Sequence, residues 1–235
     1  MKTILITGGS RGIGKSIVEE AIANNYQVIF TYNKNKKTAE QLCKKFKNKC
    51  FGIKINLSSQ KDRERLFKYI KNKKIQIDCL VNNAAYPVKR KQFTNISLSE
   101  VKKIYEINVF AIYDLSKKFV ALMKNKKEWK SIINLSSTAA KFGGHFFTHY
   151  APTKAALENL TIGLSKELAK YKIRVLCVAP GVIDTRPDNR KKSILRTIPS
   201  GRLGTPSDVS KLVIWLESKN AEYINGTTIT ISGGR

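Results

Sequence analysis

The sequence predicts an α/β fold in which seven short strands form one parallel sheet, covered by helices on both faces. Two observations lead to this prediction. Strand-like segments alternate with segments of helical period along the chain, which is typical of βαβ units. The strand-like segments are continuous apolar runs, as expected for strands that are buried on both sides. Together these features indicate a Rossmann-like, doubly wound three-layer sandwich.

The first half of the chain contains four of the expected strands. They are short apolar runs at residues 3–7, 27–32, 51–55 and 78–81. Between them, apolar residues at helical spacing predict amphipathic helices. The first helix follows a glycine-rich turn, the second spans about 36–46, and the third ends near residue 71. Ser58 or Ser59 is expected to cap the third helix.

The second half repeats the alternation with longer helices. Strands are expected at 131–135, 173–178 and 227–231, and helices at about 98–124, 149–170 and 206–217. Pro152 is compatible with the helix at 149–170 because proline is tolerated in a first turn.

The chain is expected to form a single domain over residues 1–235. This length suffices for one well-buried core but is short for two ordinary domains with a linker. The least regular segment, 184–204, is rich in Pro, Gly, Arg and Lys and follows the sixth strand. Open α/β sheets bind ligands beyond the carboxyl ends of their strands, so we interpret 184–204 as a substrate lid.

The formal charge of +27 comes mostly from lysines in short runs, such as 34–37, 71–74 and 124–130. Their spread along the chain favours solvated helix faces and a compositional origin, and we expect no nucleic-acid partner. Attraction of an acidic partner or an anionic substrate is the alternative. The apolar runs fall short of the roughly 20 residues that span a bilayer. We therefore expect a cytoplasmic protein with no membrane partner. The four cysteines are scattered, so neither a metal site nor a disulfide is expected.

A glycine-rich turn joins the first strand to the first helix. It reads Thr7-Gly8-Gly9-Ser10-Arg11-Gly12-Ile13-Gly14. Glycines allow a tight turn and a close approach of the backbone to a pyrophosphate, and the helix N-terminus offers free N–H groups. This context predicts a dinucleotide site.

The spacing Gly8-x-x-x-Gly12-x-Gly14 resembles the short-chain dehydrogenase/reductase family, and later motifs extend the resemblance over essentially the whole chain. The resemblance implies further cofactor contacts after the strands, in the segments Asn56-Leu57, Asn83-Ala84-Ala85 and Pro180-Gly181-Val182-Ile183-Asp184-Thr185. Asn56 replaces the usual aspartate, and Ala85 replaces the usual glycine.

The cofactor is expected to be NADP(H), with NAD(H) as the alternative. NAD sites typically place a carboxylate at the end of the second strand, to bind the ribose 2′-hydroxyl. Here that region reads Thr31-Tyr32-Asn33-Lys34, which has no carboxylate. Arg11 and Lys34 are instead suited to a 2′-phosphate, and Tyr32 and Asn33 are expected to border it.

The catalytic residues are expected to be Asn108, Ser137, Tyr150 and Lys154. Tyr150 and Lys154 are four residues apart on a predicted helix, so the phenol and the ammonium share one face. A nearby ammonium and a positive nicotinamide ring would bring the pKa of a phenol down towards neutral pH. The family resemblance implies that Ser137 hydrogen-bonds the substrate oxygen. It also implies that Asn108 holds a water linking Lys154 to solvent.

Three functions remain open. The motifs slightly favour a dehydrogenase of a sugar, polyol or other small molecule with a carbonyl or secondary alcohol. The first alternative is a 3-oxoacyl-(acyl-carrier-protein) reductase, whose acidic carrier protein the positive charge would suit. Glu128 and Tyr171 occupy the positions where such reductases usually carry docking arginines. Neighbouring lysines are candidates to replace those arginines, namely Lys126, Lys127, Lys130, Lys170 and Lys172. The second alternative is a non-catalytic NADP-sensing or anion-binding protein.

The resemblance also implies a homo-oligomer, either a tetramer or a dimer. The helices near 98–124 and 149–170 would lie at its interface.

Overall fold

The computed structural model describes residues 1–124, 128–185 and 191–235. Within these residues, seven parallel strands form one sheet in the order β3-β2-β1-β4-β5-β6-β7. The strands are β1 (Thr3–Ile6), β2 (Gln27–Tyr32), β3 (Cys50–Lys54), β4 (Cys79–Asn82), β5 (Lys130–Leu135), β6 (Ile173–Pro180) and β7 (Thr228–Ile231). The chain runs outward from β1 to β3 and then returns to the other side of β1 at β4. The predicted fold class is confirmed, and its strand order reverses between β1 and β4.

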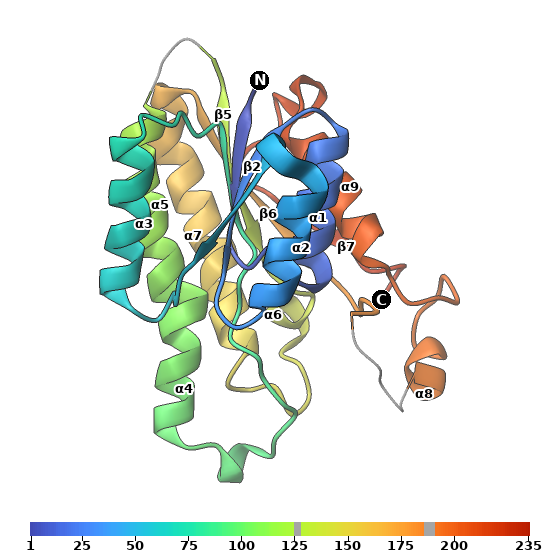
Figure 1. Ribbon diagram of the computed structural model, residues 1–235. Helices are drawn as coiled ribbons and strands as arrows, with labels where there is room; N and C mark the ends of the chain where they lie inside the picture. The colour runs from blue at the N-terminus through green and yellow to red at the C-terminus, as the bar shows by residue number, and fades with distance from the viewer. Residues whose placement is uncertain (125–127, 186–190) are drawn as a thin grey trace.

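Helices cover both faces of this sheet (Figure 1). They are α1 (Gly12–Ala23), α2 (Lys36–Phe46), α3 (Gln60–Asn72), α4 (Leu98–Tyr105), α5 (Ala111–Met123), α6 (Ala139–Phe142), α7 (Ala151–Leu168), α8 (Lys191–Leu195) and α9 (Pro206–Glu217). Buried side chains such as Ile17, Leu42 and Val213 bring α1, α2 and α9 onto one face. Leu66 and Phe119 bring α3 and α5 onto the other. The two apolar layers bury the strands on both sides, which explains their continuous apolar sequences.

The long helix expected at about 98–124 is interrupted. A π-helical turn, Glu106–Phe110, separates α4 from α5 and places Asn108 at its centre. Such turns widen a helix locally and are frequent at functional sites. Side-chain periodicity did not predict the interruption, because the same apolar face continues through it.

The helix expected at 149–170 begins two residues later. Tyr150 is its N-cap residue, and Pro152 lies in the first turn, where its missing N–H removes no hydrogen bond. Ser59, as expected, caps α3 and accepts a hydrogen bond from the Asp62 N–H (3.2 Å).

A buried ion pair lies at the amino ends of the strands, opposite the edge where the carboxyl ends meet. Lys130 Nζ donates a 2.6 Å hydrogen bond to Asp78 Oδ1, and the two side chains are 1% and 7% exposed. The other oxygen of Asp78 accepts a hydrogen bond from the Thr3 N–H at 2.8 Å. This group therefore connects the starts of β1, β4 and β5.

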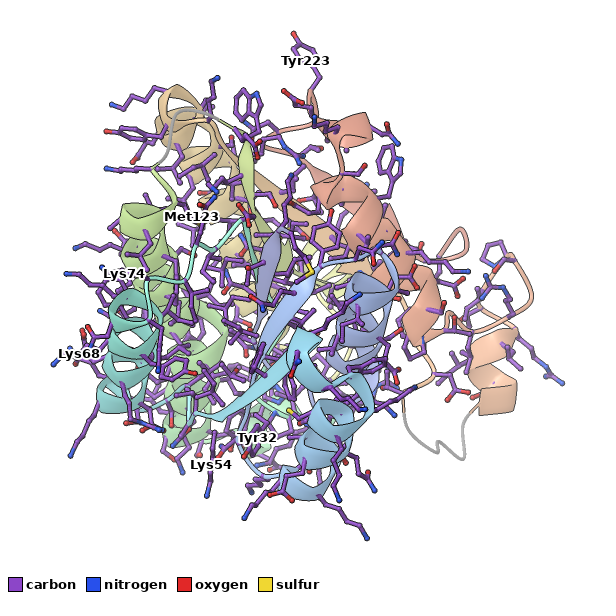
Figure 2. The ribbon with its side chains drawn as sticks, turned by 45° about the horizontal axis from the view of Figure 1, so that its top comes forward. Tyr32, Lys54, Lys68, Lys74, Met123 and Tyr223 are labelled. Atoms are coloured by element: carbon purple, nitrogen blue, oxygen red, sulfur yellow. The ribbon has the colours of Figure 1, made fainter. Side chains whose placement is uncertain are left out.

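Many of the other lysines are solvated. Lys54 and Lys68 extend outward from the ribbon in Figure 2, and both are exposed. This observation agrees with the expectation that lysines occupy exposed surfaces. In the part of the chain that the structure describes, no helix is both long and apolar enough to cross a membrane.

The segment expected to be a lid, 184–204, is described in part, because residues 186–190 lie outside the described residues. Its first residues adjoin an isolated bridge between Ile183 and Gly204. Its end is fixed by Arg202, which forms two hydrogen bonds with the Asp208 carboxylate at 2.7 and 3.0 Å. A lid function stays a prediction.

Candidate active site

The glycine-rich turn connects β1 to α1 at the carboxyl edge of the sheet. Gly8 and Gly12 have φ angles of +71° and +52°, which favour glycine. A Cβ atom at Gly14 would collide with the main-chain oxygen of Gly8. Glycine at these positions therefore allows a tight turn at the N-terminus of α1, where free main-chain N–H groups favour a pyrophosphate. Arg11 is the N-cap residue of α1 and is exposed beside this turn.

Hydrogen bonds from the end of β4 fix the shape of this turn. The Thr7 hydroxyl accepts hydrogen bonds from the N–H groups of Asn83 and Ala84, both at 3.0 Å. The Asn83 side chain in turn donates to the main-chain oxygens of Thr7 (2.8 Å) and Gly8 (3.2 Å). The Asn83 amide thus holds the glycine turn. The sequence motif had placed Asn83 near the ribose without identifying Thr7 as its partner.

A second predicted cofactor segment also reaches the glycine turn. The Thr185 methyl group lies 3.4 Å from the position that a Cβ atom on Gly12 would take. Pro180, at the end of β6, precedes Gly181, which packs so closely against Ser232 that a side chain there would clash. Ile183 is half-buried against the core of the α1 face. Thr185, at the end of this segment, therefore lies beside the first turn of α1, although the two are far apart in the sequence.

The remaining predicted cofactor residues border the same edge. Tyr32 is half-buried at the end of β2, Asn33 is exposed, and Ala85 is exposed after β4. The Asn56 side-chain oxygen accepts hydrogen bonds from the Ser58 N–H (3.3 Å) and hydroxyl (2.9 Å). Leu57 is buried, and its main-chain oxygen accepts a hydrogen bond from Arg63.

The four predicted catalytic residues come from three elements that converge at this edge. Ser137 follows β5, Tyr150 and Lys154 start α7, and Asn108 lies in the π turn. The Ser137 hydroxyl is close enough to the Tyr150 phenol to lower its pKa. The Lys154 ammonium lies 5.7 Å from the centre of the Tyr150 ring and donates to the Leu135 main-chain oxygen at 2.7 Å. A phenol, a hydroxyl and an ammonium thus meet in one place.

Burial sets the proton affinities of this group. It raises the pKa of Tyr150 to about 12, an effect that the neighbouring Ser137 hydroxyl partly opposes. It lowers the pKa of Lys154 to about 8, because a desolvated ammonium is unfavourable. The expected lowering of the Tyr150 pKa is therefore absent from the protein alone. The positive nicotinamide ring invoked for that lowering belongs to the cofactor and not to the chain.

Asn108 is fully buried and connects two segments of the site. Its side-chain oxygen accepts a hydrogen bond from the Tyr86 N–H at 2.9 Å. Its side-chain nitrogen donates to the Thr153 hydroxyl at 3.1 Å. Asn108 therefore joins the loop after β4 to the first turn of α7. Its participation in a water relay stays a prediction.

One pair of residues in the site was not predicted. The Ser136 hydroxyl donates a 2.7 Å hydrogen bond to Glu158 Oε1. This contact links the end of β5 to α7, next to Ser137. The spacing of Glu158 four residues after Lys154 was available in the sequence, because i and i+4 share a helical face.

The glycine turn follows β1, where the strand order reverses, and the Tyr150–Lys154 pair starts α7 after β5. Together they indicate a nicotinamide-dependent oxidoreductase acting on CH–OH groups. The comparisons with known proteins identify the family. A family described as "Enoyl-(Acyl carrier protein) reductase" matches residues 8–235. The chain belongs to this family, which is part of the short-chain dehydrogenases/reductases.

Relatives of known name match over nearly the full chain. The 3-oxoacyl-(acyl-carrier-protein) reductase FabG of Haemophilus influenzae is 36% identical over 238 residues, covering 99% of this chain and 97% of the relative. The reductase of the same name from Aquifex aeolicus is 34% identical over 241 residues, covering 99% and 96%. The crystal structure of 3-ketoacyl-(acyl-carrier-protein) reductase from Brucella melitensis complexed with NADH is similar with a TM-score of 0.92. It is 26% identical, and the match covers 100% of this chain and 98% of that one.

Proposed function

We propose that this chain is an NADPH-dependent 3-oxoacyl-(acyl-carrier-protein) reductase. The observation that carries the proposal is the full-length similarity to two reductases of that name. The motifs alone slightly favoured a sugar or polyol dehydrogenase, and these relatives favour the thioester reductase instead. The site chemistry is compatible, since reduction of a ketone requires hydride and a proton donor.

In this proposal the chain's own residues manage the proton and the substrate oxygen. Bound NADPH supplies the hydride. Tyr150 donates its phenolic proton to the carbonyl oxygen at the 3-position, and Ser137 hydrogen-bonds that oxygen as negative charge develops. The Lys154 ammonium stabilises the resulting phenolate and returns a proton to it, through the water that Asn108 is predicted to hold. The high pKa of Tyr150 keeps the phenol protonated until substrate binds.

We assign the 2′-phosphate of NADPH to Arg11. Arg11 is the N-cap residue of α1, so its guanidinium lies at the positive end of the helix, which also favours an anion. Tyr32 ends β2 and Asn33 follows it, and neither is a carboxylate that would repel the phosphate. Lys34, next in sequence, is exposed and adds positive charge.

The proposal includes an acidic carrier protein as the partner. Tyr171, at one of the two positions where relatives usually carry docking arginines, has two ammonium groups over its ring. Lys124 Nζ lies 4.1 Å and Lys170 Nζ 5.3 Å from the ring centre. These two lysines place positive charge around Tyr171, where the relatives usually have an arginine. Of the other expected replacements, Lys172 is half-buried nearby, whereas Lys126 and Lys127 lie outside the described residues. The expectation for Lys130 was wrong, because it is buried and paired with Asp78.

A homo-oligomer, either a tetramer or a dimer, also belongs to this proposal. Phe110 and Tyr113 are 56% and 55% exposed around the start of α5, and Ile162 on α7 is 43% exposed. Covering such aromatic side chains in a second copy would remove apolar surface from water. Sedimentation velocity on the purified protein tests the oligomeric state.

The test of function is a comparison of substrates at equal concentration. NADPH oxidation is followed with an acetoacetyl thioester, first on a pantetheine analogue and then on acyl carrier protein. NADP⁺ reduction is followed with a panel of sugars and polyols. The proposal requires thioester turnover that depends on Tyr150. Turnover confined to alcohols would establish the small-molecule dehydrogenase, and NADPH binding without any turnover would favour a sensor.

A further inference from the structure

Two cysteines lie close together between α2 and β3, although nothing in the sequence indicated that they would be paired. Cys43 lies near the end of α2, and Cys50 begins β3. The two thiols are close enough for Cys43 to raise the pKa of Cys50. Cys43 Sγ also lies 3.3 Å from the position that a Cβ atom on Gly52 would take. Because Gly52 and Cys50 share one face of β3, the Cys43 thiol lies over the face that carries Cys50.

The two thiols differ in their exposure. Cys43 is partly exposed, whereas Cys50 is 2% exposed within the apolar core of the α1 face. Burial and the neighbouring thiol raise the pKa of Cys50 to about 12, so its reactive thiolate is disfavoured. An oxidant from solvent would therefore reach and oxidise Cys43 first. Cys50 is placed to react with the oxidised sulfur.

We propose that Cys43 and Cys50 form a reversible intramolecular disulfide when the protein meets a peroxide. In the first step the Cys43 thiolate attacks the peroxide, the O–O bond breaks, and Cys43 becomes a sulfenic acid while water leaves. In the second step the Cys50 sulfur attacks Cys43 Sγ, the S–O bond breaks, and a second water leaves with the Cys50 proton. Two thiols and one hydrogen peroxide thus give one disulfide and two waters.

The position of this pair connects it to the glycine turn through a single side chain. The Phe30 ring lies 2.8 Å from the position that a Cβ atom on Gly52 would take. The Cβ of Phe30 lies 2.6 Å from the corresponding position on Gly9. Phe30 is fully buried and fills the space that both glycines leave. A shift of α2 against β3 would therefore displace Phe30 and the turn proposed to bind the cofactor.

The chemical step is tested on the full-length protein by mass spectrometry. The reduced protein is treated with hydrogen peroxide, then unfolded in denaturant, alkylated and digested without reductant. The expected product is a peptide pair joining Cys43 to Cys50, lost on treatment with dithiothreitol, while Cys79 and Cys177 are alkylated. Both of the latter are fully buried and serve as internal controls. Links between two chains, or a Cys43 sulfinic acid as the main product, would overturn the proposal.

Two variants separate the roles of the thiols. In Cys50→Ala, the Cys43 sulfenic acid should persist and react with dimedone, because the second thiol is missing. In Cys43→Ser, Cys50 should stay reduced under the same treatment. Position 43 is partly exposed and tolerates serine more easily than the buried position 50 tolerates a substitution. Cys43→Ser should therefore still fold if Cys50→Ala does not. Oxidation of Cys50 in Cys43→Ser would contradict the proposed order.

The link to the glycine turn rests on the proposed cofactor site and has its own readout. Oxidised protein should bind NADPH about fivefold more weakly than reduced protein, the lower end of typical coupling between sites. Equal peroxide treatment of Cys43→Ser should leave NADPH affinity unchanged. Equal affinity of the oxidised and reduced native proteins would disprove this coupling. If the reduced protein bound no NADPH, the proposed function would fail. The disulfide would still be tested, because mass spectrometry detects it independently of NADPH binding.

Discussion

Lys154 Nζ donates a 2.7 Å hydrogen bond to the main-chain oxygen of Leu135, which joins the first turn of α7 to the end of β5. Ser137 lies two residues beyond Leu135, and Tyr150 lies four residues before Lys154. One buried contact therefore fixes the distance between the strand that carries the hydroxyl and the helix that carries the phenol. The proposed roles of Tyr150 and Lys154 depend on this arrangement.

Replacing Tyr150 with Phe should lower kcat for ketone reduction by about a hundredfold or more, the usual effect of losing a general acid. The ring that packs in the site is retained, so NADPH affinity should stay within about twofold. Steady-state kinetics and a fluorescence titration with NADPH measure the two quantities. Activity close to that of the unaltered protein would exclude Tyr150 as the proton donor.

The rate of reduction should fall as the pH rises through about 8. The Lys154 pKa is lowered to about 8 by burial, so the ammonium that returns the proton is lost above that pH. Tyr150 stays protonated over this range, because its pKa is raised to about 12. A pH profile of kcat measures the effect, with circular dichroism and NADPH affinity recorded at each pH as controls. A flat profile to pH 10 would remove Lys154 from the rate-determining proton transfer.

Replacing Arg11 with Ala should weaken NADPH binding by about tenfold, the size expected for a hydrogen bond to a charged group. NADH lacks the 2′-phosphate, so its affinity should change little. Lys68→Ala, which removes an exposed positive charge from α3, is the matched control and should affect neither cofactor. Equal losses for NADPH and NADH would assign Arg11 to the shared pyrophosphate instead.

Replacing Lys130 with Met should lower the free energy of unfolding by about 3 kcal/mol. The substitution leaves the Asp78 carboxylate buried without its ammonium partner. Urea denaturation measures the change, and Lys68→Met on the exposed face of α3 should stay within about 0.5 kcal/mol of the unaltered protein. A similar small effect at Lys130 would show that water or a shifted side chain replaces the ammonium.

Much of the fold could be predicted because apolar strand-like runs alternate with helical segments along the chain. The predicted strands correspond to β1 through β7 with small shifts at their ends. β6 continues two residues past the prediction, to Pro180, because it pairs there with Ile231 of β7. The π turn that carries Asn108 was not predicted, and neither were the partners of the Asn108 side chain, Tyr86 and Thr153, which come from other segments.

The site divides in the same way. The residue types and their order were available from the sequence, from the glycine spacing to Tyr150 and Lys154. Their partners were not. Thr7 holds Asn83, Ser136 holds Glu158, and each contact joins elements that are distant in the sequence.

The sequence by itself determined the fold class, the glycine turn and the catalytic residue types, because apolar period, glycine and helical spacing act locally. Tertiary structure alone decided the pKa of Lys154, the burial of Lys130 and the meeting of Cys43 with Cys50. Desolvation and thiol contact depend on which atoms of remote segments surround a group. Packing of the helices against the sheet fixes that environment, and no local pattern encodes it.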